Sequence, residues 1–337
     1  MERGVISVQA VKQNYLNEVN VGRKQSNRNL AMYPLLSSYA VGLEYIALDE
    51  ALSQGLIEVM ERDEAGSVPE LKVINKSPCM ILVLDGEGLV GAKQNRIVNT
   101  TILIQGKSTT VIPVSCVEQG RWAYDSRAFS SEERLMAAQL RARKSEQVHE
   151  FIRRSDGFRS DQSAIWEEIS SKAARMEADS PTMAMSEIYK KKRSLLADYV
   201  EHFRLVEMQV GAVFMINGKV VGLDTFGRTE TFGKVFRKLI ESYALDAIDW
   251  LEQESSGKTL KSKVTKFLWA ANNATVGCHR SVGLGTDIRL EFRTLTGFAL
   301  AHQEKILHLS VFARSTGSSE GRYTARMQRF SSRRRSR

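Results

Sequence analysis

The sequence predicts an α+β fold, with β-rich layers built from antiparallel hairpins, an inserted helical block and one long packed helix. Short runs rich in Val, Ile and Thr, separated by Asn, Gly, Ser or Pro, dominate residues 45–125 and return after residue 210. Between them, residues 130–205 show the apolar spacing of helices. The 337 residues are enough to bury a core without disulfide or metal staples.

The chain divides into three predicted parts. Residues 1–30 are polar and are expected to be irregular, residues 31–312 to form one α+β domain, and residues 315–337 to be a disordered arginine-rich tail. Within the domain we expect a β-rich part at about 45–125, a helical insertion at about 130–205, and a second β-plus-helix unit at about 210–312.

The β-rich part begins with a short helix, predicted at Leu48–Gln54 with Asp49 or a neighbour as its N-cap. Alternation of apolar and polar side chains then predicts a strand at Leu56–Glu61. Ile81–Gly91 has the pattern of a hairpin with an Asp-Gly turn. The strands expected in this part besides Leu56–Glu61 are Leu71–Asn75, Met80–Leu84, Gly88–Gly91, Thr100–Ile104 and Thr110–Val117.

The helical insertion is predicted to start at Ser130, because Ser130 and Glu133 match a capping box, and this first helix is expected to run to about Arg154. Helices at Ala164–Met176 and Ser186–His202 follow. Acidic and basic side chains nearly cancel across the block. We therefore expect a helical layer or a protruding hairpin rather than a site.

The second unit opens with the strongest hairpin signal in the chain, Asn217-Gly218 between two apolar runs. A long helix is predicted from about Thr231 to Glu252, followed by a linker at Ser255–Gly257 that includes the lysines after it. The strands expected here are Gly211–Ile216, Lys219–Leu223, Thr275–Arg280, Asp287–Thr294, Thr296–His302 and Ile306–Phe312.

The formal charge of +9 is unevenly distributed. The tail from Ser315 to Arg337 has seven arginines against one glutamate, a net +6, which leaves +3 for the other 314 residues. Such a tail can bind RNA, DNA or anionic surfaces through phosphate contacts, although a solvated terminus with weak polyanion affinity is the simpler interpretation. The charge therefore points first to a small anionic ligand and only second to a polyanion.

Composition also narrows the class of protein. The three cysteines are widely spaced and have no zinc-ligand pattern, so we expect neither a disulfide scaffold nor a metal site. The sequence contains no signal-like apolar run and no stretch of about 18 apolar residues. We expect a cytoplasmic protein without a membrane association and predict no cofactor. The sequence leaves the oligomeric state open.

The segment Asp85–Arg96 is the first candidate site. It brings the carboxylate of Glu87, the ammonium of Lys93, the amide of Gln94 and the guanidinium of Arg96 into twelve residues, a set suited to an anionic, hydrogen-bonding ligand. The spacing matches neither a P-loop nor the GxGxxG fingerprint. A charged hairpin tip with solvated side chains is the alternative.

The segment Cys116–Trp122 is the second candidate. Glu118 is a potential general base or acid, Arg121 a phosphate or carboxylate holder, and Trp122 a stacking surface, with Gln119 as a further polar contact. An internal Glu118–Arg121 pair covered by Trp122 is the simpler alternative. Cys116 is expected to be a buried structural thiol.

The segment Gly222–Glu230 is the third candidate. Asp224, Thr225 or Thr229 can cap the following helix, and the same N-terminal amides would also hold an anion. We include Asp224 among the candidate ligand-binding residues.

Four stretches of the chain resemble one known family: LDGEGLVGAKQNRIVNTTILI, IPVSCVEQGRW, VGAVFMINGKVVGLDTFG and KLIESYALDA. This family is named for its association with ADP-ribosylglycohydrolases and rhodanese-phosphatase proteins, and the resemblance spans about residues 30–312. It implies a link, through neighbouring genes, to the processing of NAD-derived ADP-ribose or related nucleotides. It assigns no reaction and no catalytic residue. It also favours one shared site for GAKQNR and CVEQGRW.

We therefore expect a β-layer pocket that binds or processes an ADP-ribose-like or other NAD-derived nucleotide. Carboxylate-assisted hydrolysis or transfer fits the available groups better than redox or metal chemistry. The alternatives are a non-catalytic ligand sensor or protein-interaction module, and a nucleic-acid-associated protein that acts through its tail. The expected roles are acid/base catalysis by Glu87 and Glu118, phosphate binding by Lys93, Arg96 and Arg121, stacking by Trp122, and further ligand contacts from Gln94, Gln119 and Asp224.

Overall fold

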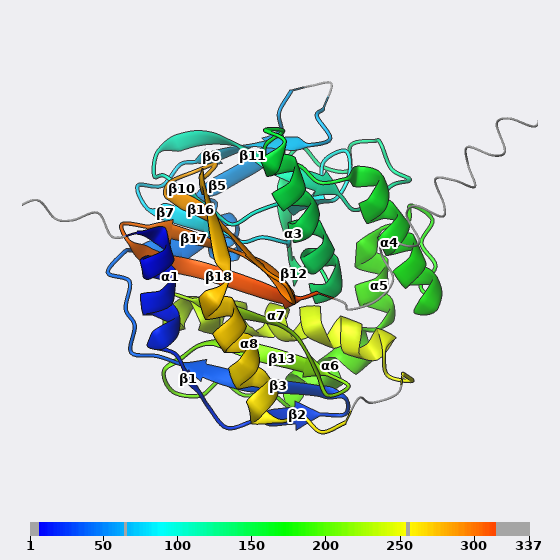
Figure 1. Cartoon of the computed structure of the whole chain (residues 1–337). Helices are drawn as coiled ribbons and strands as arrows, with labels where there is room; N and C mark the ends of the chain where they lie inside the picture. Colours follow the sequence, from blue (N-terminus) through cyan, green and yellow to red (C-terminus); the bar gives the residue numbers. More distant parts are fainter. Residues whose placement is uncertain (1–6, 64–65, 254–256, 315–337) are drawn as a thin grey trace, which may run out of the picture.

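The computed structural model describes residues 7–63, 66–253 and 257–314 of the chain (Figure 1). The arginine-rich tail at 315–337 and residues 255 and 256 of the predicted linker lie outside the described residues. The described residues form helices and three β-sheets, in which every strand pairing is antiparallel except one. The predicted α+β class is confirmed.

The largest sheet is built mainly from the second β-plus-helix unit. Its strands are β1 (Asn20–Val21), β2 (Gln25–Asn27), β3 (Leu30–Leu36), β13 (Gln209–Ile216), β14 (Lys219–Phe226), β15 (Thr275–Arg280), β16 (Thr286–Phe292), β17 (Leu295–His302) and β18 (Lys305–Ala313). They follow the order β1-β3-β13-β14-β18-β17-β16-β15, with β2 paired to β3. The predicted hairpin is present, since Asn217 and Gly218 adopt positive φ values of 49° and 76° between β13 and β14.

The β-rich first half forms the other two sheets. The six-stranded sheet contains β5 (Ile57–Glu61), β6 (Glu70–Asn75), β8 (Glu87–Gly91), β9 (Arg96–Val98), β11 (Ser108–Cys116) and β12 (Phe129–Leu135), in the order β12-β8-β9-β11-β6-β5. The three-stranded sheet contains β4 (Tyr45–Ala47), β7 (Met80–Val83) and β10 (Ile102–Ile104), in the order β10-β7-β4, with β4 parallel to β7. Ile81–Gly91 is therefore not a hairpin, because β7 and β8 pair in different sheets.

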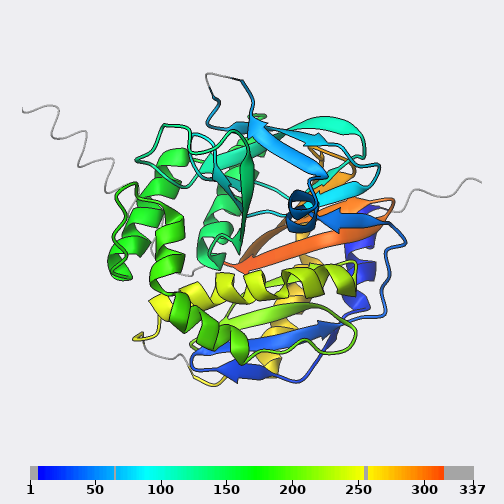
Figure 2. The same cartoon turned by 180° about the vertical axis from the view of Figure 1, so that it is seen from behind.

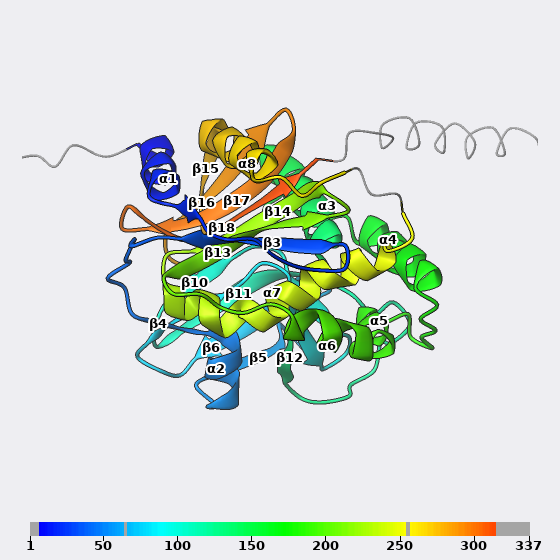
Figure 3. The same cartoon turned by 90° about the horizontal axis from the view of Figure 1, so that it is seen from below.

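Helices pack against all three sheets and cover both faces of the large one. They are α1 (Val8–Asn17), α2 (Leu48–Ser53), α3 (Ala138–Arg153), α4 (Gln162–Arg175), α5 (Met185–Lys191), α6 (Arg193–Glu201), α7 (Thr229–Asp249) and α8 (Lys261–Asn273). Figure 3 shows α1 and α8 on one side of this sheet and α7 on the other. Figure 2 shows α7 lying across the sheet, and it packs against both β13 and β12. The long packed helix thus lies between the nine-stranded and the six-stranded sheet.

Four further sequence-based expectations are wrong. Residues 7–30 are not irregular, since α1 buries Tyr15 and Leu16 and two short strands follow, while residues 1–6 of this predicted segment lie outside the described residues. The apparent capping box at Ser130 lies in strand β12, where Ser130 pairs with Val90, and α3 begins only at Ala138. The predicted third helix is interrupted at Lys192, which separates α5 from α6. The lysines assigned to the linker begin helix α8 instead, because its apolar side chains pack against the large sheet.

A layer of buried ion pairs joins these elements in the interior. The guanidinium of Arg141, on α3, donates to both carboxylate oxygens of Asp224, on β14, at 2.6 and 3.1 Å, and both side chains are fully buried. Tyr243 and Ser310 also donate to this carboxylate. Burial opposes ionisation of Asp224, but Arg141 outweighs it and holds the pKa of this carboxyl far below its usual range. The helical insertion is thereby tied to the centre of the large sheet.

The same layer neutralises carboxylates of the β-rich half. Lys144, also on α3, donates to Asp85 and to the Val98 carbonyl oxygen. Lys238, on α7, bridges the carboxylates of Glu87 and Asp49. Cations from α3 and α7 therefore compensate carboxylates from a turn (Asp85), a strand (Glu87) and helix α2 (Asp49).

Removing Asp224 should leave Arg141 buried without its main counter-ion, with only Asp85 at 3.5 Å from its Nε. We expect Asp224→Ala to lower the free energy of unfolding by about 3–5 kcal/mol, measured by urea denaturation. The control is Lys234→Ala, which removes the half-exposed partner of Glu50 and should cost at most about 1 kcal/mol. Equal effects of the two variants would show that the buried pair does not hold the fold.

Glu132 gives a prediction for pH. Its side chain is 7% exposed, and its nearest cation, Arg134, lies 3.9 Å away. Burial raises the pKa of Glu132 to about 7, against weaker opposing effects of Arg134 and Lys190. Because the folded state binds this proton more tightly than the unfolded chain, the contribution of Glu132 to stability is present at acid pH and is lost as the pH rises through 7.

Glu132→Gln should therefore raise the free energy of unfolding by about 1–3 kcal/mol at pH 8 and change it little at pH 5. Denaturation at both pH values measures this difference. Glu133→Gln, at the exposed neighbour, should have nearly the same effect at both. A loss of stability at pH 8 in Glu132→Gln would contradict the assignment.

Candidate functional site

The two segments singled out in the sequence lie side by side. In the six-stranded sheet, β8 leads into the turn Ala92–Asn95 and then into β9. The end of β11 pairs with β9, so that Cys116 lies opposite Arg96. The amide of Val117 donates to the Asn95 carbonyl oxygen at 3.1 Å. GAKQNR and CVEQGRW therefore form one continuous structural unit, which we call the paired loops (residues 91–96 and 116–124).

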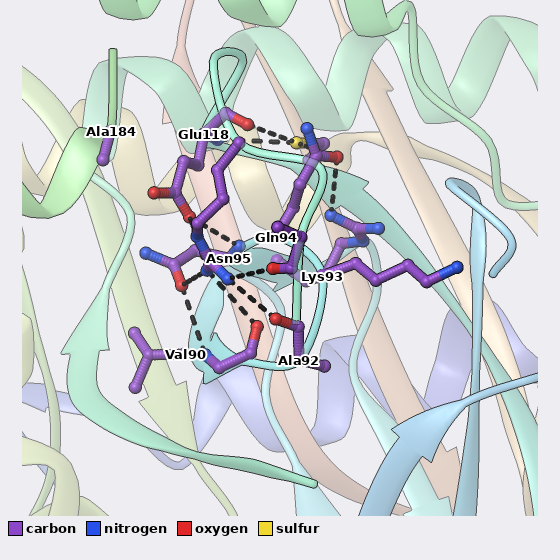
Figure 4. A network of polar contacts seen from close by, with 12 residues as sticks. Val90, Ala92, Lys93, Gln94, Asn95, Glu118 and Ala184 are labelled. Carbon is purple, nitrogen blue, oxygen red and sulfur yellow. Dashed lines mark hydrogen bonds and ion pairs between the residues drawn. The ribbon is translucent and has the colours of Figure 1, made fainter. Parts of the chain in front are cut away.

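Glu118 holds the paired loops together. Its Oε2 accepts hydrogen bonds from Arg121 Nε at 3.0 Å and from Arg121 Nη2 at 2.7 Å. It also accepts one from the amide of Asn95 at 3.1 Å (Figure 4). Arg121 also donates to Asn95 Oδ1 at 3.0 Å and to the Ala92 carbonyl oxygen at 2.7 Å. The structure thus shows the internal Glu118–Arg121 pair that was the simpler of the two interpretations.

This pairing decides the chemistry open to Glu118. Burial alone would favour its neutral form, but the hydrogen bonds from Arg121 and the Asn95 amide outweigh it and hold the pKa of Glu118 below its usual value. The group is therefore a carboxylate at neutral pH and has no proton to give. Its contacts to both loops suit it to anchoring rather than to general acid catalysis.

The helical insertion supports the paired loops from outside the sheet. Gln162, at the start of α4, accepts a hydrogen bond from the Cys116 amide at 2.8 Å and donates to the Cys116 carbonyl oxygen at 2.7 Å. The amide of Gly120 donates to the Thr182 carbonyl oxygen at 2.8 Å, and a Cβ atom at Gly120 would lie 2.9 Å from Thr182 Cα. Only glycine allows this approach. The insertion, expected to be a helical layer or a protruding hairpin rather than a site, thus contacts the second of the paired loops.

Lys93, Trp122 and Tyr124 form an aromatic and cationic surface beside the anchor. The Lys93 ammonium lies 5.4 Å from the Trp122 ring centre and 5.1 Å from that of Tyr124. Trp122 is 50% exposed and Tyr124 is 56% exposed. In Figure 4 the Lys93 side chain extends away from Asn95 and Glu118. We call these three residues the aromatic–lysine surface.

An open groove of about 580 Å³ adjoins this surface, and Tyr124 and Glu61 both line it. Its other lining residues carry charges of both signs, namely Arg62, Asp63, Lys72, Asp125 and Arg127, together with Met60 and Ser126. The groove is therefore an amphoteric surface rather than a purely cationic phosphate site.

Beside the groove, Arg96, a predicted phosphate-binding residue, is buried in a pair with Glu61, which the sequence analysis did not single out. Glu61 Oε1 is 3.8 Å from Arg96 Nη2, and the two side chains are 4% and 0% exposed. Arg96 donates to Gln94 Oε1 at 3.1 Å and lies 5.9 Å from the Trp122 ring centre. The signal for Glu61 was present in the sequence, because this carboxylate follows Ile57 and Val59 on the buried face of its strand.

Cys116 is a structural thiol. Its Sγ lies 3.0 Å from Gln94 Oε1 and 3.2 Å from the Glu118 carbonyl oxygen, and it is fully buried. Burial raises the pKa of this thiol despite the nearby Arg96. A buried thiol with a raised pKa is a poor nucleophile.

Two predicted site residues, Glu87 and Asp224, lie apart from this arrangement, whereas Gln119 is part of the paired loops. Glu87 is enclosed by Lys238 and the Leu84 amide, and four residues of extended strand, roughly 13 Å, separate it from Gly91. Asp224 does not cap α7, whose N-cap is Arg228 without a side-chain bond, because its carboxylate is bound by Arg141 inside the large sheet. Gln119 lies exposed at the turn. Glu87 and Asp224 belong to the interior ion pairs and do not share a pocket with Glu118.

The described part of the chain contains no group of three or more His, Cys, Asp and Glu side chains placed to hold a metal ion. Among the same residues, no helix is both long and apolar enough to cross a bilayer.

Comparisons with known proteins identify the family. The chain has no significant match among curated proteins or among solved structures. A family model described as the ARG and Rhodanese-Phosphatase-superfamily-associated Protein domain matches residues 18–312. This match covers most of the chain, including both paired loops and the strands that position them, and leaves out the tail. The chain therefore belongs to the ARG and rhodanese-phosphatase-superfamily-associated protein domain family.

Proposed function

We propose that the chain binds an ADP-ribose-like or other NAD-derived nucleotide at the aromatic–lysine surface. The observation that carries this proposal is the placement of one ammonium over two half-exposed aromatic rings. Exposed aromatic rings stack on nucleobases, and a neighbouring cation attracts their phosphates. The family's association with ADP-ribosylglycohydrolases supports this class of ligand. A cytoplasmic location, in which the exposed thiols of Cys79 and Cys278 stay reduced, is part of the same proposal.

The remaining cations of the paired loops have positioning roles in this proposal. Arg121 uses Nε, Nη1 and Nη2 to bind Glu118, Asn95 and backbone carbonyl oxygens. These bonds fix the backbone that precedes Trp122. Arg121 therefore presents the ring, and Lys93 supplies the charge that meets the phosphate.

The hydrogen bonds already made by Glu118 favour a protein that binds the ligand over one that processes it. Glu118 is engaged by Arg121 and Asn95, so it is not free to activate water. Glu61 is the better candidate if the ligand is processed, because it lines the groove and its Oε2 has no hydrogen-bond partner among the described residues. Hydrolysis with Glu61 as general base is therefore the second candidate function.

Ligand binding can be tested by thermal denaturation with ADP-ribose, NAD and simple nucleotides. A ligand at a hundredfold excess over its Kd should stabilise the folded state by about 2.7 kcal/mol. Trp122→Ala should weaken binding about fivefold or more, because stacking on one ring contributes about 1–3 kcal/mol. Lys93→Ala should also weaken binding, because it removes the charge that meets the phosphate. Trp269→Ala is the matched control, since this exposed ring lies on α8. If no nucleotide raises the midpoint of thermal denaturation, the proposal is overturned.

Turnover can be measured by chromatography of the ligand after incubation with the protein. Binding alone predicts that ADP-ribose and NAD are recovered intact. A product that forms with the wild-type chain and with Glu58→Gln, but not with Glu61→Gln although this variant still binds, would establish the second candidate function. Glu58 is the matched control because it lies on the same strand and pairs with Lys76.

A further inference from the structure

The Glu61–Arg96 pair contains three buried polar atoms without hydrogen-bond partners among the described residues. Arg96 Nε and Nη2 and Glu61 Oε2 are buried, and none has a hydrogen-bond partner within the described ranges. Buried polar atoms are nearly always hydrogen-bonded, and each unsatisfied one costs about 1–3 kcal/mol. Because the two side chains approach to 3.8 Å, the donors and the acceptor belong to one location.

The unsatisfied donors of Arg96 and the unsatisfied acceptor of Glu61 restrict which chemical group can bind between them. Arg96 offers two N–H donors, and Glu61 offers one carboxylate acceptor. A phosphate has only acceptors near neutral pH and would be repelled by Glu61. A cation would be repelled by Arg96. A neutral planar group with an N–H donor next to a C=O acceptor satisfies both residues at once.

The location is connected to the proposed ligand surface. Glu61 lines the groove, and Trp122 lies over Arg96 at 5.9 Å while remaining half exposed. The residues that follow Trp122, from 123 to 127, are exposed as well. Trp122 is therefore the exposed side chain beside which we expect a ligand to reach the pair. The same ring then provides the stacking face.

We infer that Glu61 and Arg96 recognise an amide-type edge on the ring of the ligand, with Glu61 accepting its N–H and Arg96 donating to its C=O. This inference rests on the proposed function and names the part of the ligand that confers selectivity. Two kinds of ring carry such an edge in nucleotides: nicotinamide, through its carboxamide, and lactam bases such as hypoxanthine.

The test compares ligands that differ only in this edge, by calorimetric titration of the full chain. Nicotinamide mononucleotide is paired with nicotinic acid mononucleotide, which replaces the carboxamide by a carboxylate. Inosine monophosphate is paired with its 1-methyl derivative, which lacks the N–H. We expect the intact edge to bind at least about tenfold more tightly in one of the two pairs, because the altered ligand leaves Glu61 or Arg96 without a partner.

The variant Glu61→Gln tests whether the Glu61 carboxylate causes the preference between the paired ligands. Its amide can donate to the carboxylate of nicotinic acid mononucleotide, so the preference for the carboxamide should fall toward one. If only inosine monophosphate and its 1-methyl derivative are distinguished, Glu61→Gln should reduce the difference between their affinities. Glu58→Gln should keep the wild-type ratio. Thermal denaturation without ligand confirms that both variants are folded.

The outcomes separate this inference from the proposed function. Equal affinities within both pairs, with ADP-ribose still bound, would overturn the inference and leave the proposed function intact. A preference that persists unchanged in folded Glu61→Gln would also overturn it. Failure of every nucleotide to bind would overturn the proposed function. A preference in either pair that Glu61→Gln removes would support the inference and identify the ring.

Discussion

Neutralisation of buried charge is the constraint on which this structure depends. Arg141 and Asp224 are fully buried, so each needs the other, and their ion pair fixes α3 against the large sheet. The rest of the insertion follows α3 and contributes Gln162, whose side chain binds both the amide and the carbonyl of Cys116. The position of the paired loops is therefore set by ion pairs in the interior. Truncating one partner is costly because it leaves an uncompensated charge in a low-dielectric environment.

The paired loops take part in two carboxylate–guanidinium pairs with opposite properties, and the carboxylate of the second pair, Glu61, comes from β5. In the Glu118–Arg121 pair the hydrogen-bonding groups are engaged within the protein, which makes the pair an anchor. In the Glu61–Arg96 pair the two groups are 3.8 Å apart and retain unsatisfied donors and an acceptor. The first pair thus shapes the aromatic–lysine surface, and the second gives it a buried group with directional preference. The ring of a nucleotide would stack on Trp122, its phosphate would meet Lys93, and a polar edge of the ring would bind Glu61 and Arg96.

Local sequence signals predicted much of this fold and less of the site. Asn217-Gly218 specified its hairpin because both residues tolerate positive φ values, and the apolar face of α7 specified a long buried helix. The capping-box interpretation of Ser130 failed because pairing with Val90 overrides a local helix signal. Glu87 and Asp224 were assigned to the site because polar residues at strand ends resemble ligand contacts, whereas their partners Lys238 and Arg141 are distant in sequence. Long-range ion pairs of this kind leave no local pattern.

The central claim is that a nucleotide ring stacks on Trp122, and NMR of the indole N–H groups tests it most directly. The chain has four tryptophans, and a ¹⁵N-labelled sample resolves one indole signal from each. On titration with ADP-ribose, the account predicts a saturable shift of the Trp122 signal, assigned with Trp122→Ala, while the exposed Trp269 signal stays in place. Saturable binding that leaves Trp122 unshifted, or that shifts Trp269 instead, would contradict it.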